Sequence, residues 1–170
     1  MKQSIIAATN RERARRRMGV LRRLPGLDEA AQGHANDMAR WGFFSHTSPV
    51  RGKRKTRDRL ELAGVPDAMT GGENIATRVA LVYLPNRPVF SPSQTGRGFS
   101  YSLKGPSLPR YTPGAYGRML VRGWMDSPPH RKNLLEPRYD FVGVGLCVNP
   151  HSADQMPIYS VVQNFSARLE

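Results

Sequence analysis

The sequence predicts an α+β protein: a three-layer α-β-α sandwich with a small antiparallel sheet flanked by helices. Two observations lead to this fold class. Helix start and stop signals recur through most of the chain, and two runs of β-forming residues follow, at residues 141–148 and 158–166. The length of 170 residues suits a single domain that buries a sizeable core without disulfides.

Two helices are expected near the N-terminus. The first covers residues 4–17 and stops at Gly19, since glycine readily adopts the left-handed conformation that closes a helix. Asp28 is expected to cap the second, over residues 29–41, which carries a narrow apolar stripe of small residues. His34 lies on this second helix, and of the four histidines it is the one that we expect to be structural.

Three further helices are expected in the middle of the chain. Residues 57–64 form a short helix that ends in glycine, and residues 74–84 carry apolar side chains at helical spacing. Thr112 can cap a helix that begins with Pro113 and runs through Met125, because a proline in the first turn needs no amide hydrogen.

A short helix after Ser127 carries the most informative histidine. Ser127 is a suitable N-cap, Pro128 suits the first helical position, and the helix stops before Pro137. His130 therefore lies in the first turn, where the positive end of the helix disfavours a charged imidazolium. A neutral imidazole can bind a metal or accept a proton. The alternative is a surface histidine on a capping turn.

The last two elements are strands. Residues 141–148 are apolar on both alternating faces, which is typical of a central strand, and residues 158–166 suit its hairpin partner. Cys147 lies in the first run, so we expect an inert, buried thiol. As the single cysteine of the sequence, it can form no disulfide within the chain.

The net charge of +13 comes largely from two basic groups. The first consists of Arg11, Arg13, Arg15, Arg16, Arg17, Arg22 and Arg23. The second consists of Arg51, Lys53, Arg54, Lys55, Arg57 and Arg59, of which the first five are the candidate polyanion contacts. Basic groups attract nucleic acids, anionic lipids and anionic envelope polymers. Because no aromatic residues for base stacking are interleaved with them, we favour an anionic cell surface over nucleic acid. A solvated basic face is the alternative.

No apolar run is long enough for a signal peptide or a transmembrane helix. We nevertheless expect an extracellular or envelope location, with a targeting segment that lies outside this sequence. A cytoplasmic location is the alternative.

Four sets of residues, in this order, resemble one family. They read HANDMARWGFFSHTSP at 34–49, GGENIA at 71–76, WMDSPPHRKNLL at 124–135, and GVGLCVN with YSVVQNF at 143–149 and 159–165. From about residue 6 to residue 165, the chain resembles a prokaryotic member of the superfamily of cysteine-rich secretory proteins, antigen 5 and pathogenesis-related proteins, whose domain is called CAP or SCP-like. The resemblance implies the same α-β-α sandwich. The single cysteine separates this chain from the disulfide-rich eukaryotic members.

The resemblance also implies a cleft with two histidines and two acidic residues. His46 and His130 match the histidines, and Glu73 matches the first glutamate. The second glutamate is replaced by Ser127, with Asp126 one position earlier, so both are additional cleft candidates and the acidic pair is incomplete.

The cleft has three possible uses. Two neutral imidazoles can weakly hold Zn²⁺, or another divalent metal, at roughly 2.0–2.1 Å, with Glu73 as a ligand or an orienting group. The three side chains could instead form a polar cluster with no physiological metal. In the third use, Glu73 is the catalytic base that takes a proton from metal-bound water.

Three functions correspond to these features. The first is a secreted or envelope-associated CAP-domain binding module, expected to be a monomer, whose ligand is a lipid or a cell-wall component, as the resemblance implies. The second is a metal-dependent hydrolase of peptide or envelope substrates, against which the missing second glutamate argues. The third is a polyanion binder, which would require the two basic groups to merge into one patch.

Residues 86–111 look like an insertion, since simple relatives join the flanking elements by a much shorter connection. The segment is rich in Pro, Ser and Gly, but it also carries four aromatic residues, which is unusual for a plain linker. We expect it to pack on the domain beside the cleft, because both its anchors belong to elements that carry site residues.

Overall fold

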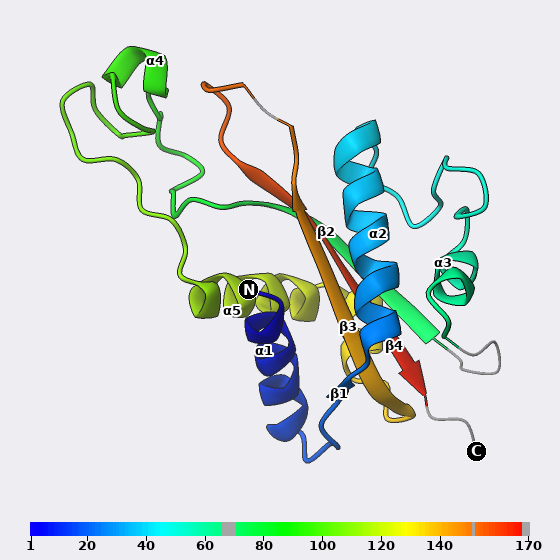
Figure 1. The fold of residues 1–170 in the computed structure, drawn as a ribbon. Helices are drawn as coiled ribbons and strands as arrows, with labels where there is room; N and C mark the ends of the chain where they lie inside the picture. The colour runs from blue at the N-terminus through cyan, green and yellow to red at the C-terminus, as the bar shows by residue number, and fades with distance from the viewer. Residues whose placement is uncertain (66–70, 151, 168–170) are drawn as a thin grey trace.

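A four-stranded mixed sheet lies between two layers of helices in the computed structural model, which describes residues 1–65, 71–150 and 152–167 (Figure 1). The strands are β1 (Arg22–Arg23), β2 (Gly71–Val79), β3 (Tyr139–Val148) and β4 (Ile158–Ala167), in the spatial order β1-β3-β4-β2. β4 pairs antiparallel with both β3 and β2, while β1 runs parallel to β3. The predicted fold class is confirmed, although β1 makes the sheet mixed rather than wholly antiparallel.

The helices cover both faces of the sheet. One layer consists of α1 (Lys2–Ala14), α5 (Pro113–Asp126) and α6 (Pro128–Leu134), and the other of α2 (Pro25–Trp41) and α3 (Thr56–Leu62). In Figure 1, α1 and α5 lie to the left of the sheet and α2 and α3 to its right. α4 (Pro92–Thr95) is a single turn in the long connection from β2 to α5. Among the described residues, no helix has both the length and the apolarity that crossing a bilayer requires.

Side chains alternate along β4, so the sheet has a core on each face. Val161 and Phe165 pack with α1 and α5 in the larger core, whereas Val162 packs on α2 in a smaller one. Two glycines of β3 bring α2 close to the sheet, because a Cβ atom on Gly143 or Gly145 would lie 2.2 Å from a backbone carbon of α2. Glycine at these two alternating positions therefore lets the helix backbone rest directly on the strand.

Several expected elements are confirmed. α5 begins at Pro113, and the hydroxyl of Thr112 accepts a hydrogen bond from the Ala115 amide at 3.3 Å, as an N-cap does. α3 is followed by Gly64 in the left-handed conformation, with φ of 69°. β3 and β4 form the expected hairpin, and α6 ends before Pro137.

The predicted end of the first helix is wrong. α1 ends at Ala14, and the residue in the left-handed conformation after it is Arg17, with φ of 58°, rather than Gly19. The amide of Met18 donates to the Arg13 carbonyl at 3.1 Å, which closes the helix before the chain reaches the glycine.

The predicted cap of the second helix is also wrong. α2 begins at Pro25, so Asp28 lies in its first turn rather than at the N-cap, which is Leu24. The Asp28 carboxylate accepts a hydrogen bond from the Val144 amide at 2.7 Å instead. This side chain therefore ties α2 to β3, a contact that local sequence signals do not reveal.

The helix expected over residues 74–84 is wrong, because most of this segment belongs to β2 or directly follows it. All nine residues of β2 pair with β4. Ile75 and Ala76 are both buried, but in the cores on opposite faces of the sheet. The apolar residues of this strand thus lie in two cores, and their spacing in the sequence resembles that of a helix. Cys147, which was expected to be buried, is only half-buried.

We predict that Gly145→Ala lowers the free energy of unfolding by about 3 kcal/mol or more, since the new methyl group must push α2 away from β3. Urea denaturation measures this change. Gly33→Ala is the matched control, because no atom lies within 4 Å of its added Cβ, and replacing a helical glycine should stabilise by about 0.5–1 kcal/mol. Equal stability of Gly145→Ala and the parent protein would contradict the close packing of α2.

Candidate functional site

The carboxylate of Glu73 is the centre of the candidate site. Glu73 lies near the start of β2, opposite Asn164 of β4, and its side chain points to the α2–α3 layer. It is buried, and each oxygen has a partner: Oε2 accepts from Arg59 Nη2 at 2.7 Å, and Oε1 accepts from His46 Nδ1 at 2.8 Å. In the amide orientation that satisfies its neighbours, Asn164 donates to Oε2 at 3.2 Å.

These contacts keep Glu73 ionised. Burial by itself would raise the pKa of this carboxyl, but the hydrogen bond from His46 and the positive charge of Arg59 outweigh burial, so the pKa lies below its ordinary value. An ionised carboxylate can only accept hydrogen bonds. The proton of a neutral His46 is therefore on Nδ1, and its Nε2 keeps a lone pair. His46 is about half exposed, at 53%, so this nitrogen is accessible to a ligand.

Arg59 holds the loop that carries His46. Its guanidinium is 2% exposed and donates to the carbonyl oxygens of Lys53 and His46 at 3.0 and 3.2 Å, as well as to Glu73. The sequence predicts Arg59 only as a member of a basic group, and this role was not predicted. The position of Arg59 within the arginine- and lysine-rich run does not indicate burial, because its acidic partner, Glu73, is on a strand that comes near only in the fold.

His34 is buried beneath the same carboxylate. Its Nε2 lies 3.0 Å from the Ser45 carbonyl oxygen and 4.0 Å from Glu73 Oε1, with no exposed surface. Burial is the largest cause that lowers the pKa of His34. The imidazole is therefore neutral at neutral pH and positions the start of the His46 loop, in agreement with the structural role expected for it.

His130 reaches the site from the other helical layer. Asn74, the neighbour of Glu73, points to the opposite face of the sheet and donates from its side-chain amide to the His130 carbonyl at 3.2 Å. Asn133 of α6 donates to the Glu73 carbonyl at 3.1 Å and to Asn74 Oδ1 at 2.9 Å. A Cβ on Gly72 would lie 2.8 Å from Asn133 Oδ1, so glycine before the glutamate lets α6 approach β2.

His46 and His130 come from opposite helical layers, and both lie near β2, through Glu73 and Asn74 respectively. β2 is an edge strand, so residues from both helical layers can meet there. The pKa of His130 is lowered by burial first, then by the charge of nearby His46 and by Arg78. The helix dipole was expected to keep His130 neutral; the direction of the pKa shift agrees, but burial is its main cause. Ser127 Oγ lies 2.9 Å from His130 Nδ1 and orients the ring.

Two nitrogen atoms near Glu73 have the chemistry of metal ligands. Glu73 already uses both oxygens, so it orients His46 and is not an unengaged ligand. With Nδ1 of His46 and of His130 in hydrogen bonds, each imidazole keeps Nε2 for a metal. In the part of the chain that the structure describes, no three His, Cys, Asp or Glu side chains gather to hold an ion. Two imidazoles suit an open site completed by other oxygens, and not a closed structural one.

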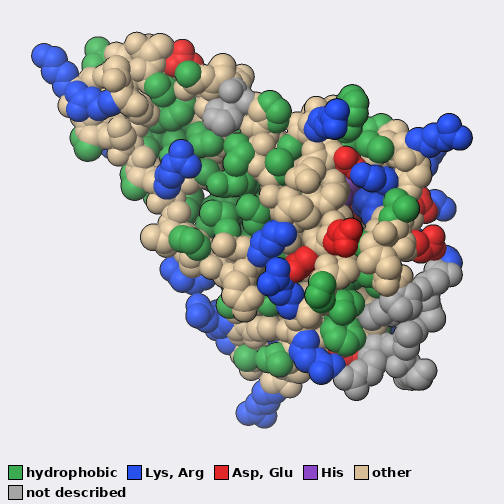
Figure 2. All heavy atoms as spheres, in the orientation of Figure 1, with side chains coloured by type: hydrophobic (Ala, Val, Ile, Leu, Met, Phe, Trp, Pro, Cys, Tyr) green, Lys and Arg blue, Asp and Glu red, His purple; other side chains and the backbone are tan. Residues whose placement is uncertain are grey.

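The two basic groups do not merge. The first lies along α1 and the segment after it, and the second on the loop and helix after α2, in the opposite helical layer. Lys and Arg side chains are scattered over the face seen in Figure 2. Within the second group, Lys53 pairs with Asp37 at 3.2 Å and Arg57 with Glu61 at 2.9 Å. The remaining candidate contacts, all exposed, are Arg51, Arg54 and Lys55.

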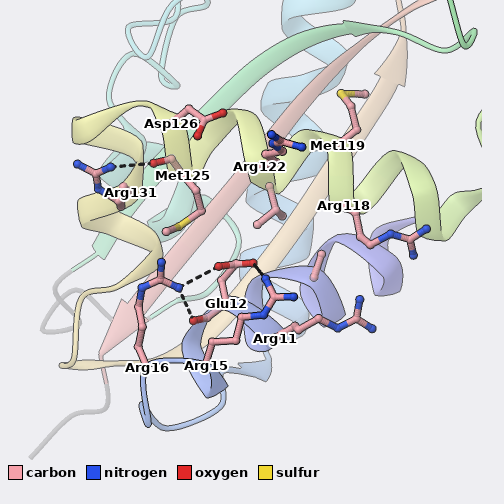
Figure 3. A pocket seen from close by; sticks show the side chains of 12 residues that line it. Arg11, Glu12, Arg15, Arg16, Arg118, Met119, Arg122, Met125, Asp126 and Arg131 are labelled. Carbon is pink, nitrogen blue, oxygen red and sulfur yellow. Dashed lines mark hydrogen bonds and ion pairs between the residues drawn. The ribbon is translucent and has the colours of Figure 1, made fainter.

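Asp126 is among the residues that line a groove between α1 and α5 (Figure 3), and its part in the cleft stays a prediction. The expected place of the insertion is wrong. The segment 86–111 lies at the far end of β2, near α4, rather than beside the cleft (Figure 1). Glu73 is at the start of β2 and His130 follows the end of α5, so about 20 Å of strand and of helix separate the insertion from the site. Its four aromatic residues are half-buried.

Comparison with known proteins agrees with the motifs. The sequence model of the cysteine-rich secretory protein family, CAP, matches residues 6–165. The chain is 27% identical over 143 residues to YkwD, an uncharacterized protein of Bacillus subtilis, and 33% identical over 118 residues to YlbC, an uncharacterized membrane protein of that organism. These alignments cover 84% and 69% of this chain but 41% and 23% of the relatives. The chain thus spans less than half the length of the curated relatives that it matches.

Solved structures share the fold. An extracellular protein with an SCP domain from Bacillus anthracis has a TM-score of 0.65 at 25% identity, covering 98% of this chain and 40% of that one. An outer surface protein of Borrelia burgdorferi has a TM-score of 0.62 at 14% identity, covering 98% of this chain and 92% of its own. At that identity, the second likeness shows the fold alone.

We predict that Arg59→Met lowers the free energy of unfolding by about 3–5 kcal/mol, because it leaves the buried charge of Glu73 without its cationic partner. Adding Glu73→Met should recover much of that loss, and urea denaturation of the four proteins in the cycle measures the coupling. As control, Arg57→Met in the exposed pair with Glu61 should cost about 0.5 kcal/mol or less. Additive effects of the two substitutions would contradict a coupled pair.

We also predict that NMR titration finds the pKa of His130 below the ordinary value and that His46→Gln raises it. As pH falls below about 6.5, the unfolded chain takes up this proton first, so the folded state loses stability there, and the loss should shrink in His46→Gln. Arg97→Gln removes an exposed charge near α4 and should leave the titration unchanged. An unchanged His130 titration in His46→Gln would show that the imidazoles are not neighbours.

Proposed function

Since this chain belongs to the cysteine-rich secretory protein family, we propose that it is a binding module that acts outside the cell or on its surface, with the cleft of His46, Glu73 and His130 as its ligand site. The location is supported by the SCP-domain protein of Bacillus anthracis, which is described as extracellular. A lipid or another envelope component is the ligand class that we favour.

The observation that carries the proposal is the state of Glu73. A general base must have an oxygen available and a pKa close to the working pH. Glu73 has neither, because Arg59 and His46 occupy its oxygens and its pKa is lowered. The carboxylate therefore orients His46 and does not activate water. This favours binding over the metal-dependent hydrolase, in which Glu73 would be the base.

A divalent ion, with zinc as the first candidate, would be held by Nε2 of His46 and of His130. When bound, such an ion supplies a Lewis-acidic position for an oxygen of the ligand. The chain itself orients both rings, through Glu73 and Ser127, and the ionised Glu73 also fixes the tautomer of His46. The lowered pKa of His130 also keeps its imidazole neutral, and the neutral form is the one that binds a metal.

A groove beside His46 offers room for the remainder of the ligand. It has a volume of about 660 Å³ and is lined by the loop that includes Ser45, Thr47, Arg51 and Arg54. Hydroxyl groups and two exposed guanidiniums suit a ligand with phosphate or carboxylate oxygens. Two exposed aromatic side chains on the same stretch of chain, Trp41 and Phe44, add apolar surface. This combination supports an amphipathic envelope molecule.

We predict that calorimetric titration finds weak Zn²⁺ binding, abolished by the double substitution His46→Ala and His130→Ala. Glu73→Gln should weaken zinc binding about 10-fold to 100-fold, because it removes the charge that orients His46. Asp126→Asn, which removes an acid from a different groove, should leave the affinity unchanged. A chelator should not alter the thermal unfolding temperature; unfolding by the chelator would contradict an accessory site.

The hydrolase alternative has its own readout. If the protein is a binding module, the zinc-loaded form should show no Glu73-dependent hydrolysis of peptides or envelope polymers. Hydrolysis that disappears in Glu73→Gln, while the variant stays folded, would favour the enzyme over the binding module.

A further inference from the structure

A second groove lies between α1 and α5, in the helical layer opposite to that of α2 and α3. The two helices touch where Gly117 meets Ser4, since a Cβ there would lie 2.6 Å from the Ser4 carbonyl oxygen. From that contact they diverge and leave a groove of about 680 Å³, closed at one end by α6 (Figures 1 and 3). The groove exists because a glycine fixes the helices closely at one point only.

Arginine dominates the walls of this groove. Six line it, against two carboxylates, those of Glu12 and Asp126. They are Arg11, Arg15 and Arg16 of α1, Arg118 and Arg122 of α5, and Arg131 of α6. Figure 3 shows α1 and α5 presenting them from the two sides of the groove. Such a concentration of one charge raises the local concentration of anions.

Half of these arginines have partners within the protein. Glu12 accepts from Arg15 at 2.6 Å and from Arg16 at 2.9 Å, and Arg131 donates to the Met125 carbonyl at 3.1 Å. Within the described residues, the other three guanidiniums have neither a hydrogen bond nor an ion pair. They are Arg11, Arg118 and Arg122. These three are exposed and available to an anion.

The spacing of the arginines suits a linear ligand. Arg11 and Arg15 on one wall, and Arg118 and Arg122 on the other, are each one helical turn apart, about 5–6 Å between their Cβ atoms. Like charges at this spacing repel, and bound anions would relieve the repulsion. Each guanidinium can donate two parallel hydrogen bonds to one phosphate. Successive arginines can therefore meet successive phosphates of one chain.

The groove lacks the features that other anionic partners need. No aromatic side chain lines it, so bases of a single-stranded nucleic acid would find no surface to stack on. None of the large exposed hydrophobic side chains of the described residues lies in it, so it offers nothing to insert into a bilayer. Its floor consists of Ala8, Met119, Val121 and Met125, which suits a short aliphatic backbone between charges.

We propose that this groove binds a linear polymer of phosphodiesters joined by aliphatic or sugar units, without aromatic bases. This site is separate from the cleft of His46 and His130, and it differs from the loop of residues 51–57 that the sequence indicated for polyanions. The two sites can be occupied together, because Asp126 and Arg131 line the groove whereas the neighbouring Ser127 and His130 serve the cleft.

The probe for this site is synthetic poly(glycerol phosphate), titrated calorimetrically at several salt concentrations. Substituting Arg11, Arg118 and Arg122 together by Gln should weaken binding on the order of 100-fold or more, since each charged hydrogen bond is worth roughly tenfold. The slope of log affinity against log salt should fall by about two to three. Asp126→Asn, which removes a negative charge from the groove, should strengthen binding.

A matched control removes the same charge elsewhere. Arg97→Gln, Lys104→Gln and Arg110→Gln together remove three exposed cations from the connection that precedes α5, and should weaken binding only slightly. Equal loss in both triple variants would mean that net charge alone drives binding, and would overturn the proposal. Zinc binding retained by the groove variant shows that it is folded and that the two sites are separate.

The parent protein supplies a measurement that needs no substitution. Methyl NMR signals of Met119 and Met125 should shift when the polymer is added. Vesicles of phosphatidylglycerol, oligothymidylate and inorganic phosphate, tested with the same variants, identify the alternatives. Stronger arginine-dependent binding of any of these three than of the polymer, or methyl signals that do not move, would overturn the proposal.

Discussion

The buried ion pair between Arg59 and Glu73 is the constraint on which the rest of the site depends. Removing two charges from water is costly, and good hydrogen-bond geometry must compensate for it. Arg59 meets this condition by donating to Glu73, to Thr56 Oγ1 and to carbonyl oxygens of the loop before α3. The bonds that the two terminal nitrogens of the guanidinium make therefore also fix the loop. The carboxylate, kept ionised by the hydrogen bond from His46 and the charge of Arg59, fixes the proton of a neutral His46 on Nδ1.

The second constraint is the position of β2 at the edge of the sheet. Successive side chains of a strand point to opposite faces, so Glu73 faces α2 and α3 while Asn74 faces α6. On an inner strand, these two networks would be separated by the sheet. At the edge, the loop of His46 and the helix of His130 contact neighbouring residues of the same strand, Glu73 and Asn74. An edge strand is thus what makes this site possible.

The arginines that give this protein its high positive charge have different roles. Arg59 and Arg13 are buried and structural; Arg13 donates to carbonyl oxygens of Gly19, Leu134, Glu136 and Tyr139, and so ties the end of α1 to the segment that follows α6. Others pair with nearby carboxylates, and three in the α1–α5 groove have no partner among the described residues. Only the last kind suggests a ligand, and net charge by itself does not distinguish the three.

Local sequence signals predicted those features that depend on neighbouring residues alone. N-cap and proline signals located α5 and α6, β-forming runs located the hairpin, and the family motifs selected His46, Glu73 and His130. Contacts between distant residues were decided by the tertiary structure. β2 looked helical because its apolar residues serve two cores, and its strand identity comes from pairing with β4. The roles of Arg59 and Asn133, and the groove between α1 and α5, likewise depend on partners far away in the chain. A side chain's burial and charge state depend on those partners, which no local pattern records.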